Sequence, residues 1–442
     1  MPNYIVIKNK IKNFNKKITV SGDKSISIRW VLFSSIASGI STAKNLLMSE
    51  DVTAALNAVK KLGIKVIIKK NTCKIYGKGI NGLKFNKNLT IDAKNSGTLG
   101  RLILGLLVNS NKEIKLIGDS SLSRRDFKRV TDPLSKFGAT FKLSKNKYLP
   151  LTIKGVDITK PIYHYEDKGS AQVKSSIILA ALKTPGTTVI KAKKSRNHTE
   201  ILCKHLRLPI KIKNYDKFDL IKINKAKKIG ALNYDIPSDI SSSAFFIILT
   251  SLAKNSKLLI KNVNINSSRI GVVEILKMMG IKIIFKNKKI YKGEPIADVL
   301  VKSPRKIKPI NCPTKFNSGA IDEFLSIFLV AAKADGVSTF NDLSELNQKE
   351  SPRLIWGSKI LNLLGIKNIM TKNSIKIFGN PNLFVDKKIV IKGFLKDHRV
   401  FMTSVIAALS FGGSWHIHDR DSIKTSFPNF LNIINQIKNE KY

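Results

Sequence analysis

The sequence predicts an α/β (α+β) fold of two similar domains, each made of three copies of one α/β unit, with a cleft between the domains. Two observations lead to this prediction. An apolar helical pattern, a glycine and a strand-like alternation recur in that order along the chain, and six apolar stretches each begin with a short polar motif. At 442 residues the chain suits two domains of roughly 200 residues better than a single core.

The recurring pattern is clear four times and weaker twice. Glycine after the last periodic residue is typical of a helix C-terminus, where a left-handed conformation costs it little. Clear copies cover residues 59–66, 134–141, 276–283 and 361–366, whereas 203–210 lacks the glycine and 430–437 resembles a helix cut short. Alternation at 65–69 and 282–285 predicts strands. Six copies of about 74 residues would fill the chain, a period too long for the usual solenoids.

A second helix in each copy is predicted where a polar motif opens an apolar stretch. These stretches are residues 24–38, 97–108, 171–182, 241–253, 320–334 and 398–410. Generic amphipathic helices would not explain why polar motifs recur at the same phase of each repeat. We therefore expect domains at 1–20 with 237–442, and at 21–236.

The charge of the chain is strongly positive, but it does not predict nucleic-acid binding. Lys and Arg number 78 against 30 Asp and Glu, for a net charge of +48. Lysine is enriched together with Ile and Asn throughout, as a low-GC genome would produce, and aromatics are only 7%. The lysines form no single block and no stripe interleaved with aromatic residues. We expect no nucleic-acid partner, while the charge would steer anionic substrates inward.

Cysteine usage and hydropathy predict a cytoplasmic protein, and we also expect a monomer without a metal or a cofactor. Cys73, Cys203 and Cys312 form no CxxC pair and no disulfide framework, which fits a reducing compartment. The apolar run at residues 4–7 is too short for a signal peptide, and no apolar stretch is long enough to span a membrane. No cluster of His and Cys indicates a metal site.

Twelve arginines stand among 66 lysines, so each marks a position that the far commoner lysine does not fill. The planar guanidinium grips carboxylate or phosphate with two hydrogen bonds, whereas lysine is a mobile point charge. Seven arginines lie in short polar clusters: Arg29, Arg101, Arg124, Arg125, Arg196, Arg353 and Arg399. This pattern predicts a site for small, highly anionic substrates.

In the first half of the chain, the polar motifs begin helices. The motif Asp23-Lys24-Ser25-Ile26-Ser27-Ile28-Arg29 could converge on one anion at a helix N-terminus, or could be an ordinary capped helix. Asn95-Ser96-Gly97-Thr98 would let a ligand approach the backbone at Gly97. Ser170-Ala171-Gln172 could bind hydroxyls or a carboxylate. Thr199-Glu200 could simply begin a helix, so Ser195 and Arg196 are the better ligand candidates.

In the second half, carboxylates stand beside cations. Asp322-Glu323 lies at a helix start, and Lys349-Glu350-Ser351-Pro352-Arg353 places Glu350 between two cations. A carboxylate near cations in a site that excludes water can be tuned for proton transfer. Asp397 before His398-Arg399 is interpreted as a structural N-cap.

These motifs, in this order, resemble the EPSP synthase family of enolpyruvyl transferases from about Ser21 to Phe430. The resemblance implies the six-unit fold, with the first strand belonging to the C-terminal domain. It implies transfer of the enolpyruvyl group of phosphoenolpyruvate to the 5-hydroxyl of shikimate 3-phosphate, with release of phosphate. Several motifs are closer to the divergent bacterial class of the family, and Gly97 is the small residue that leaves room for the inhibitor glyphosate.

The resemblance also assigns residues to the substrates. For shikimate 3-phosphate they are Lys24, Ser25, Arg29, Ser170, Ala171, Gln172, Ser195, Arg196, Asp322 and Lys349. For phosphoenolpyruvate they are Lys24, Gly97, Arg125, Gln172, Glu350, Arg353 and Arg399. The resemblance implies that Asp322, with Lys24, accepts the proton of the 5-hydroxyl. Glu350 is the candidate for proton transfer to and from the methylene carbon, and Lys24 is the alternative.

Three positions depart from the family pattern: Asp126, Pro352 and Thr425. Pro352 fixes the backbone and removes an N–H, so the direction of the Arg353 side chain is an open question. At Thr425 part of the family has a lysine, and the neighbouring Lys424 could replace it. These departures keep open a catalytically inactive relative with a binding role. The related transferase acting on UDP-N-acetylglucosamine is disfavoured, because it uses a loop cysteine whereas Cys73 falls in a predicted strand.

Overall fold

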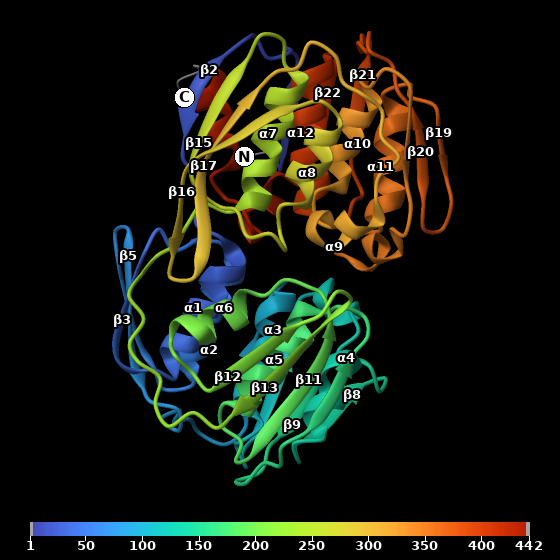
Figure 1. The fold of residues 1–442 in the computed structure, drawn as a ribbon. Helices are drawn as coiled ribbons and strands as arrows, with labels where there is room; N and C mark the ends of the chain where they lie inside the picture. Colours follow the sequence, from blue (N-terminus) through green and yellow to red (C-terminus); the bar gives the residue numbers. More distant parts are fainter. Residues whose placement is uncertain (1–2, 439–442) are drawn as a thin grey trace. The chain divides into compact units, whose positions relative to one another are not determined.

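The computed structural model describes residues 3–438 and divides the chain into two compact units (Figure 1). Unit 2 comprises Gly22–Ile236 and the tetrapeptide Tyr291–Glu294. Unit 1 comprises the N-terminal segment through Ser21, Pro237–Ile290 and the segment from Pro295 onward. These bounds differ from the predicted domains only by Ser21 and the tetrapeptide. Each unit has its own hydrophobic core.

Unit 2 contains three four-stranded sheets with one shared topology. Each has a parallel edge pair followed by two antiparallel pairings: β14-β3-β5-β4, β6-β7-β9-β8 and β10-β11-β13-β12. The strands are β3 Ser38–Lys44, β4 Lys65–Lys69, β5 Thr72–Lys78, β6 Leu89–Asp92, β7 Glu113–Ile117, β8 Thr140–Ser144, β9 Tyr148–Lys154, β10 Tyr163–Glu166, β11 Thr187–Lys193, β12 Ile210–Asn214, β13 Phe218–Asn224 and β14 Tyr234–Asp235.

The helices of unit 2 alternate between buried and outer positions. Helices α1 (Lys24–Ser35), α3 (Gly97–Leu107) and α5 (Ala171–Ala181) are largely buried, and α3 packs against both α1 and α5. The other helices are α2 Glu50–Lys61, α4 Lys128–Ser135, α6 His198–His205 and the short η1 Leu122–Arg124. The polar motifs of the sequence thus stand at the N-termini of the three buried helices.

Unit 1 also contains three sheets, one of four strands and two of three strands. Their orders are β16-β17-β15-β2, β18-β20-β19 and β1-β22-β21. The strands are β1 Tyr4–Ile7, β2 Asn15–Ile18, β15 Lys257–Asn264, β16 Lys282–Tyr291, β17 Glu294–Lys302, β18 Val337–Phe340, β19 Asn368–Met370, β20 Ile375–Phe378, β21 Lys388–Ile391 and β22 Ser414–His418. Strand β2 pairs parallel to β15, so the N-terminal segment completes a sheet whose other strands begin at Lys257.

Three mutually packed helices form the centre of unit 1: α7 (Ile240–Leu252), α10 (Phe324–Ala332) and α12 (His398–Phe411). All residues of α7 and α10 are buried. The remaining helices are α8 Gly271–Met278, α9 Asn317–Ala320, α11 Arg353–Leu363, α13 Phe430–Lys438 and the short η2 Thr314–Phe316, η3 Ser344–Gln348 and η4 Arg420–Thr425. Among residues 3–438, no helix is long and apolar enough to cross a membrane.

The predicted α/β class is confirmed, and two helix predictions need correction. The helix expected at 24–38 ends at Ser35, because Ser38 already pairs with Lys78 in a sheet. The helix expected at 320–334 is split, because residues 321–323 form a turn between α9 and α10.

The four glycines predicted to end helices all have left-handed backbones. Their φ angles are +83° at Gly63, +110° at Gly138, +89° at Gly280 and +75° at Gly365. In the weaker copy, Arg207 occupies the corresponding position with φ +51°. The repeat therefore imposes the left-handed conformation even where glycine is missing.

Candidate functional site

Three helix N-termini of unit 2 carry the predicted ligand residues. Asp23, Ser96 and Ser170 each cap a buried helix by accepting a backbone N–H, at 2.9 Å from Ile26, 3.2 Å from Leu99 and 3.3 Å from Val173 respectively. Side-chain hydrogen bonds between the first two turns of α1, α3 and α5 show that these turns lie beside one another. Free N–H groups and the helix dipole make such positions favourable for anions.

Lys24, in the first turn of α1, is fixed by a carboxylate. Its Nζ lies 2.9 Å from Oδ2 of Asp51 in α2. The Asp51 side chain is 7% exposed and that of Lys24 is 25% exposed. The ammonium group is therefore held in place from the protein side and is accessible from the solvent side.

Arg125 and Gly97 form the second part of the unit 2 site. A Cβ atom on Gly97 would lie 3.2 Å from Nη1 of Arg125 and 2.8 Å from Nη1 of Arg101. Arg125 Nη2 donates to Asn95 Oδ1 at 3.4 Å and to Ser121 Oγ at 3.3 Å. Two guanidinium groups thus flank the open N-terminus of α3, an arrangement suited to a carboxylate or phosphate.

Arg101 links the second part of the site to the third. Its Nη1 donates to Gln172 Oε1 at 2.8 Å, and Gln172 Nε2 donates to Thr98 Oγ1 at 3.1 Å. The guanidinium also stacks over Phe127, 5.0 Å from the ring centroid. The orientation of Gln172, a predicted ligand of both substrates, is therefore set by two residues of α3.

The remaining predicted ligands of unit 2 differ in exposure. Arg29 is 3% exposed and donates to Thr199, Ser175 and the Ser25 carbonyl. Ser195 and Arg196 are half-buried in the loop before α6. Within the described part of the chain, Ser195 Oγ is buried and has no hydrogen-bond partner.

The unit 1 site is built around Arg353, the first residue of α11. Its Nη1 donates to Asp322 Oδ1 at 3.3 Å, its Nη2 to Glu350 Oε2 at 2.5 Å, and its Nε to Asp397 Oδ2 at 2.9 Å. Lys349 Nζ lies 3.5 Å from Asp322 Oδ1. One buried guanidinium therefore orients both predicted catalytic carboxylates.

The electrostatics of this cluster favour its charged form. Burial alone would lower the pKa of the Arg353 guanidinium, but Asp397, Glu350 and Asp322 raise it above its ordinary value. Burial likewise opposes ionisation of Asp397, yet Arg353 outweighs it and lowers the pKa of that carboxyl. The arginine and the aspartate are thus stabilised as a charged pair.

The departures from the family pattern have identifiable structural roles. Pro352 is the N-cap residue of α11, a position compatible with its missing N–H. The direction of the Arg353 side chain is set by the carboxylates that it binds. The Asp126 carbonyl accepts from Arg101 Nη2 at 3.2 Å. Thr425 lies beside His398, with Oγ1 3.3 Å from Nδ1, while Lys424 is exposed and pairs with Asp421 at 2.9 Å.

Two predictions about Asp397 and Cys73 are confirmed. Asp397 is an N-cap, accepting from the Arg399 N–H at 2.9 Å, and it also binds Arg353 and Ser351. Cys73 lies in β5. Arg399 donates to the Asp322 carbonyl at 3.0 Å and pairs with Glu323 at 3.3 Å, so α12 is also tied to the backbone of Asp322.

Sequence reasoning did not consider Asp51, set Thr199 aside as a possible helix start, and named Arg101 among the clustered arginines without assigning it to a substrate. Arg101 carried a signal, because it stands one helical turn after Gly97 in the same motif. Asp51 carried none, since Glu50-Asp51 after Ser49 is an ordinary acidic first turn of a helix.

Comparison with known proteins gives the family of this chain. Residues 8–434 match the family described as EPSP synthase (3-phosphoshikimate 1-carboxyvinyltransferase). The chain is 40% identical over 422 residues to the 3-phosphoshikimate 1-carboxyvinyltransferase of Ruthia magnifica subsp. Calyptogena magnifica, covering 95% of this chain and 94% of that protein. The chain belongs to the EPSP synthase family. The enzyme of Hydrogenovibrio crunogenus is 36% identical over 430 residues, with 95% and 94% covered.

Solved structures agree with this assignment. EPSP synthase from Acinetobacter baumannii superimposes with a TM-score of 0.86 at 34% identity, covering 98% of this chain and 97% of that chain. The enolpyruvyl transferase NikO from Streptomyces tendae, at 13% identity and a TM-score of 0.77, shares the fold. The resemblance of the motifs is thus confirmed, and the activity is that of a 3-phosphoshikimate 1-carboxyvinyltransferase in aromatic amino-acid biosynthesis.

Proposed function

We propose that the protein joins phosphoenolpyruvate to the 5-hydroxyl of shikimate 3-phosphate, with Asp322 and Glu350 as proton carriers. The observation that carries this proposal is the orientation of both carboxylates by Arg353, at 3.3 and 2.5 Å. Two carboxylates held apart on one rigid fork can serve two different proton transfers. No other pair of predicted catalytic groups has this arrangement in the described residues of unit 1.

The proposed first step is an addition. Asp322 accepts the proton of the 5-hydroxyl as its oxygen bonds to C2 of phosphoenolpyruvate, and Glu350 delivers a proton to the methylene carbon C3. The resulting tetrahedral centre carries both the new ether oxygen and the phosphate oxygen. Both proton transfers avoid free hydroxide or hydronium, the usual benefit of positioned acids and bases.

The second step is an elimination. The bond between C2 and the phosphate oxygen breaks, and phosphate departs with the proton that Asp322 took from the hydroxyl. C3 returns a proton to Glu350, which restores the double bond and both carboxyl groups to their starting states. Lys24, Arg125 and Arg399 would stabilise the charge on the leaving group and on the substrate carboxylate. All the nitrogens of Arg353 donate to carboxylates in the structure, so its assignment to phosphoenolpyruvate requires one of these bonds to be exchanged for the substrate.

Residues of unit 2 would bind the anionic ends of the substrates. Ser25, Arg29, Ser170, Ala171, Gln172, Ser195 and Arg196 are proposed for shikimate 3-phosphate together with Lys349, and Gly97, Arg125 and Gln172 for phosphoenolpyruvate. Support comes from the helix N-termini and from the two arginines that flank Gly97. The proposal requires residues of both units to reach the same substrates, so the predicted location of the reaction between two domains stays a prediction.

The test is phosphate release by the purified protein with phosphoenolpyruvate, with and without shikimate 3-phosphate. Release that needs both substrates is expected. Asp322→Asn and Glu350→Gln should each lower kcat by about 10²- to 10⁴-fold. In ²H₂O the Glu350→Gln variant should also fail to incorporate deuterium at C3, whereas loss of incorporation in Lys24→Met alone would assign that proton to Lys24. Retention of full activity in Asp322→Asn would refute the proposal.

Three further parts of the proposal concern partners and location. We propose a cytoplasmic monomer that does not bind nucleic acid, supported by the even spread of lysine and by three buried free cysteines. Sedimentation of the protein at two concentrations and a salt-dependent mobility shift with single-stranded DNA would test these points. A stable dimer or salt-sensitive DNA binding would contradict them.

A further inference from the structure

The first turn of α6 buries three consecutive polar residues, His198, Thr199 and Glu200. They are 2%, 0% and 3% exposed. A helix start on a protein surface would leave such residues in water, and sequence reasoning gave Thr199-Glu200 only as a possible helix start. Burying three polar side chains is costly unless each is paired, so this turn has a structural task beyond beginning a helix.

Each of the three residues reaches a different element of unit 2. His198 Nδ1 lies 2.7 Å from Glu294 Oε1 in the tetrapeptide between β16 and β17. Glu200 Oε1 lies 2.6 Å from Nζ of Lys174 in α5. Thr199 Oγ1 lies 2.7 Å from Nε of Arg29 in α1 and 2.7 Å from Oγ of Ser175 in α5. The turn therefore connects α1, α5 and the tetrapeptide.

The directions of the hydrogen bonds around Thr199 follow from counting hydrogens. Ser175 has one O–H and donates it to the Ala171 carbonyl at 2.6 Å. Thr199 must therefore donate its own O–H to Ser175, and its oxygen accepts from Arg29 Nε. Ser175 also accepts from Arg29 Nη2 at 2.9 Å. The chain of bonds runs from Arg29 through Thr199 and Ser175 to the backbone of α5.

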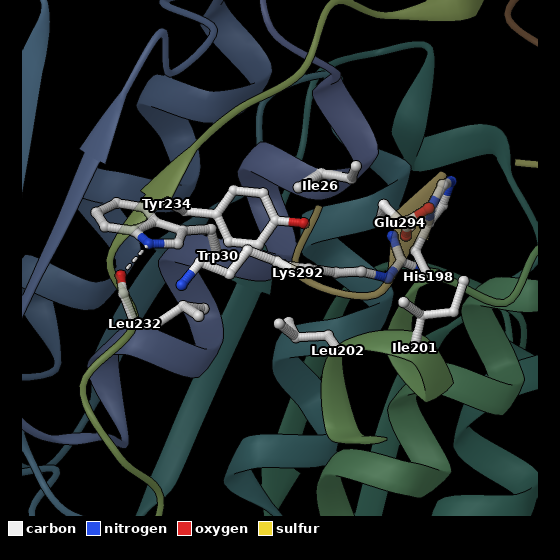
Figure 2. A pocket seen from close by; sticks show the side chains of 10 residues that line it. Ile26, Trp30, His198, Ile201, Leu202, Leu232, Tyr234, Lys292 and Glu294 are labelled. Atoms are coloured by element: carbon white, nitrogen blue, oxygen red, sulfur yellow. Dashed lines mark hydrogen bonds and ion pairs between the residues drawn. The ribbon is translucent and has the colours of Figure 1, made fainter. Parts of the chain in front are cut away.

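The space beside Arg29 allows little movement. Arg29 lines a cavity of only about 10 Å³, together with Ile26, Trp30, Leu202, His198 and Glu294. Figure 2 shows His198 and Glu294 side by side at one end of this cavity, beyond the apolar side chains of Ile26 and Leu202. Such a volume holds at most one water molecule. The guanidinium plane is thus set by Thr199 and Ser175 and confined by packing.

We propose that Thr199 is a positioning residue: it sets the plane of the Arg29 guanidinium so that this arginine can bind the anionic groups of shikimate 3-phosphate. The inference rests on the proposed assignment of Arg29 to that substrate. A planar donor fork binds carboxylate or phosphate well only when its plane is aligned with the acceptor. Removing the Thr199 hydroxyl should therefore weaken binding of shikimate 3-phosphate and leave binding of phosphoenolpyruvate unaffected.

The test compares three threonine variants by steady-state kinetics. Thr199→Val keeps the size of the side chain and should raise KM for shikimate 3-phosphate by about tenfold, the usual effect of one charge-assisted hydrogen bond. KM for phosphoenolpyruvate and kcat should stay within about twofold. Thr199→Ser restores the hydroxyl and should behave as wild type. Thr184→Val is the matched control, since Thr184 is buried in the same unit and bonded to Ala180 and Thr159.

Several results would overturn the inference. They are an unchanged KM for shikimate 3-phosphate in Thr199→Val, an equal rise for both substrates, or the same rise in Thr184→Val. If Thr199→Val does not fold, Ser175→Ala tests the same chain of bonds with a smaller change and should show the same selective rise. Arg29→Met separates the two proposals: if it leaves KM for shikimate 3-phosphate unchanged, the substrate assignment of Arg29 is wrong.

Discussion

Replacing Gly97 by alanine should weaken binding of phosphoenolpyruvate without destabilising the protein. The new Cβ would lie 2.8 Å from Arg101 Nη1, and ordinary contact begins at 3.4 Å, so the guanidinium must move by at least 0.6 Å (3.4 − 2.8). A shift directly away from Gln172 would lengthen its 2.8 Å bond to Oε1 to about 3.4 Å (2.8 + 0.6), well past the length of a strong charge-assisted bond. Loss of one such charge-assisted bond costs about 1.5–3 kcal/mol, which corresponds to about a 10- to 100-fold rise in KM.

The assay is phosphate release with phosphoenolpyruvate varied at saturating shikimate 3-phosphate. Folding should not suffer, because both clashing atoms are ends of flexible side chains and alanine favours the helix by up to about 1 kcal/mol. Gly100→Ala is the control in the same helix, with Phe127 at 3.2 Å as its nearest contact. A KM for phosphoenolpyruvate within twofold of wild type would refute the reasoning. Since the resemblance to the family implies that Gly97 leaves room for glyphosate, we expect inhibition of the wild type and weaker inhibition of the Gly97→Ala variant.

Further predictions concern stability. Asp397→Asn removes one partner of a buried ion pair and should lower the free energy of unfolding by about 3 kcal/mol, measured with urea at neutral pH. Since the pKa of Asp397 is lowered in the folded protein, the difference in stability between the variant and wild type should shrink as the pH falls below 3.8. Burial lowers the pKa of Lys183 from 10.5 to about 8, so between pH 8 and 10.5 the folded protein binds fewer protons than the unfolded protein. The free energy of unfolding of wild type relative to Lys183→Met should therefore rise across this pH range, by at most about 3 kcal/mol. A flat difference would show that Lys183 keeps its proton. Arg207→Gly should stabilise by about 1 kcal/mol in the same assay, because Arg207 has a φ of +51°; a loss of stability would mean that the side chain of Arg207 contributes more than its strained backbone costs.

The repeated units and the helices that begin with polar motifs could be predicted because both are local patterns. Helix periodicity, a terminal glycine and an N-cap residue all lie within about a dozen residues of one another. The strand at Lys65–Lys69 and the cap role of Asp397 were predicted correctly on that basis. The Ser, Gly and Arg residues of the motifs also have fixed offsets from the helix start, which is why the family could be recognised from one sequence.

The partners of these residues could not be predicted, because they come from distant parts of the chain. Arg29 and Thr199 are 170 positions apart, and Arg353 and Asp397 are 44 apart. Nothing in the local sequence distinguishes a buried first turn such as His198-Thr199-Glu200 from an exposed one. The split of the helix expected at 320–334 was missed because the predicted helix began at Ala320, although Asp322 and Glu323 come directly before the apolar run of α10.

The place of strand β2 in unit 1 has a consequence for how the chain is synthesised. Unit 2 is nearly contiguous and can complete its sheets as it leaves the ribosome, whereas β2 must wait for β15 and β1 must wait for β22. After β1 ends at Ile7 the ribosome adds 411 residues (418 − 7) before β22 is complete, and after β2 ends at Ile18 it adds 246 (264 − 18) before β15 is complete. These take about 20 to 80 s and about 12 to 50 s at typical rates. During this delay the N-terminal strands are without their partners. Asn15, Lys16 and Lys17 make β2 a polar, charged strand, and such residues oppose pairing with other chains until its own sheet is ready.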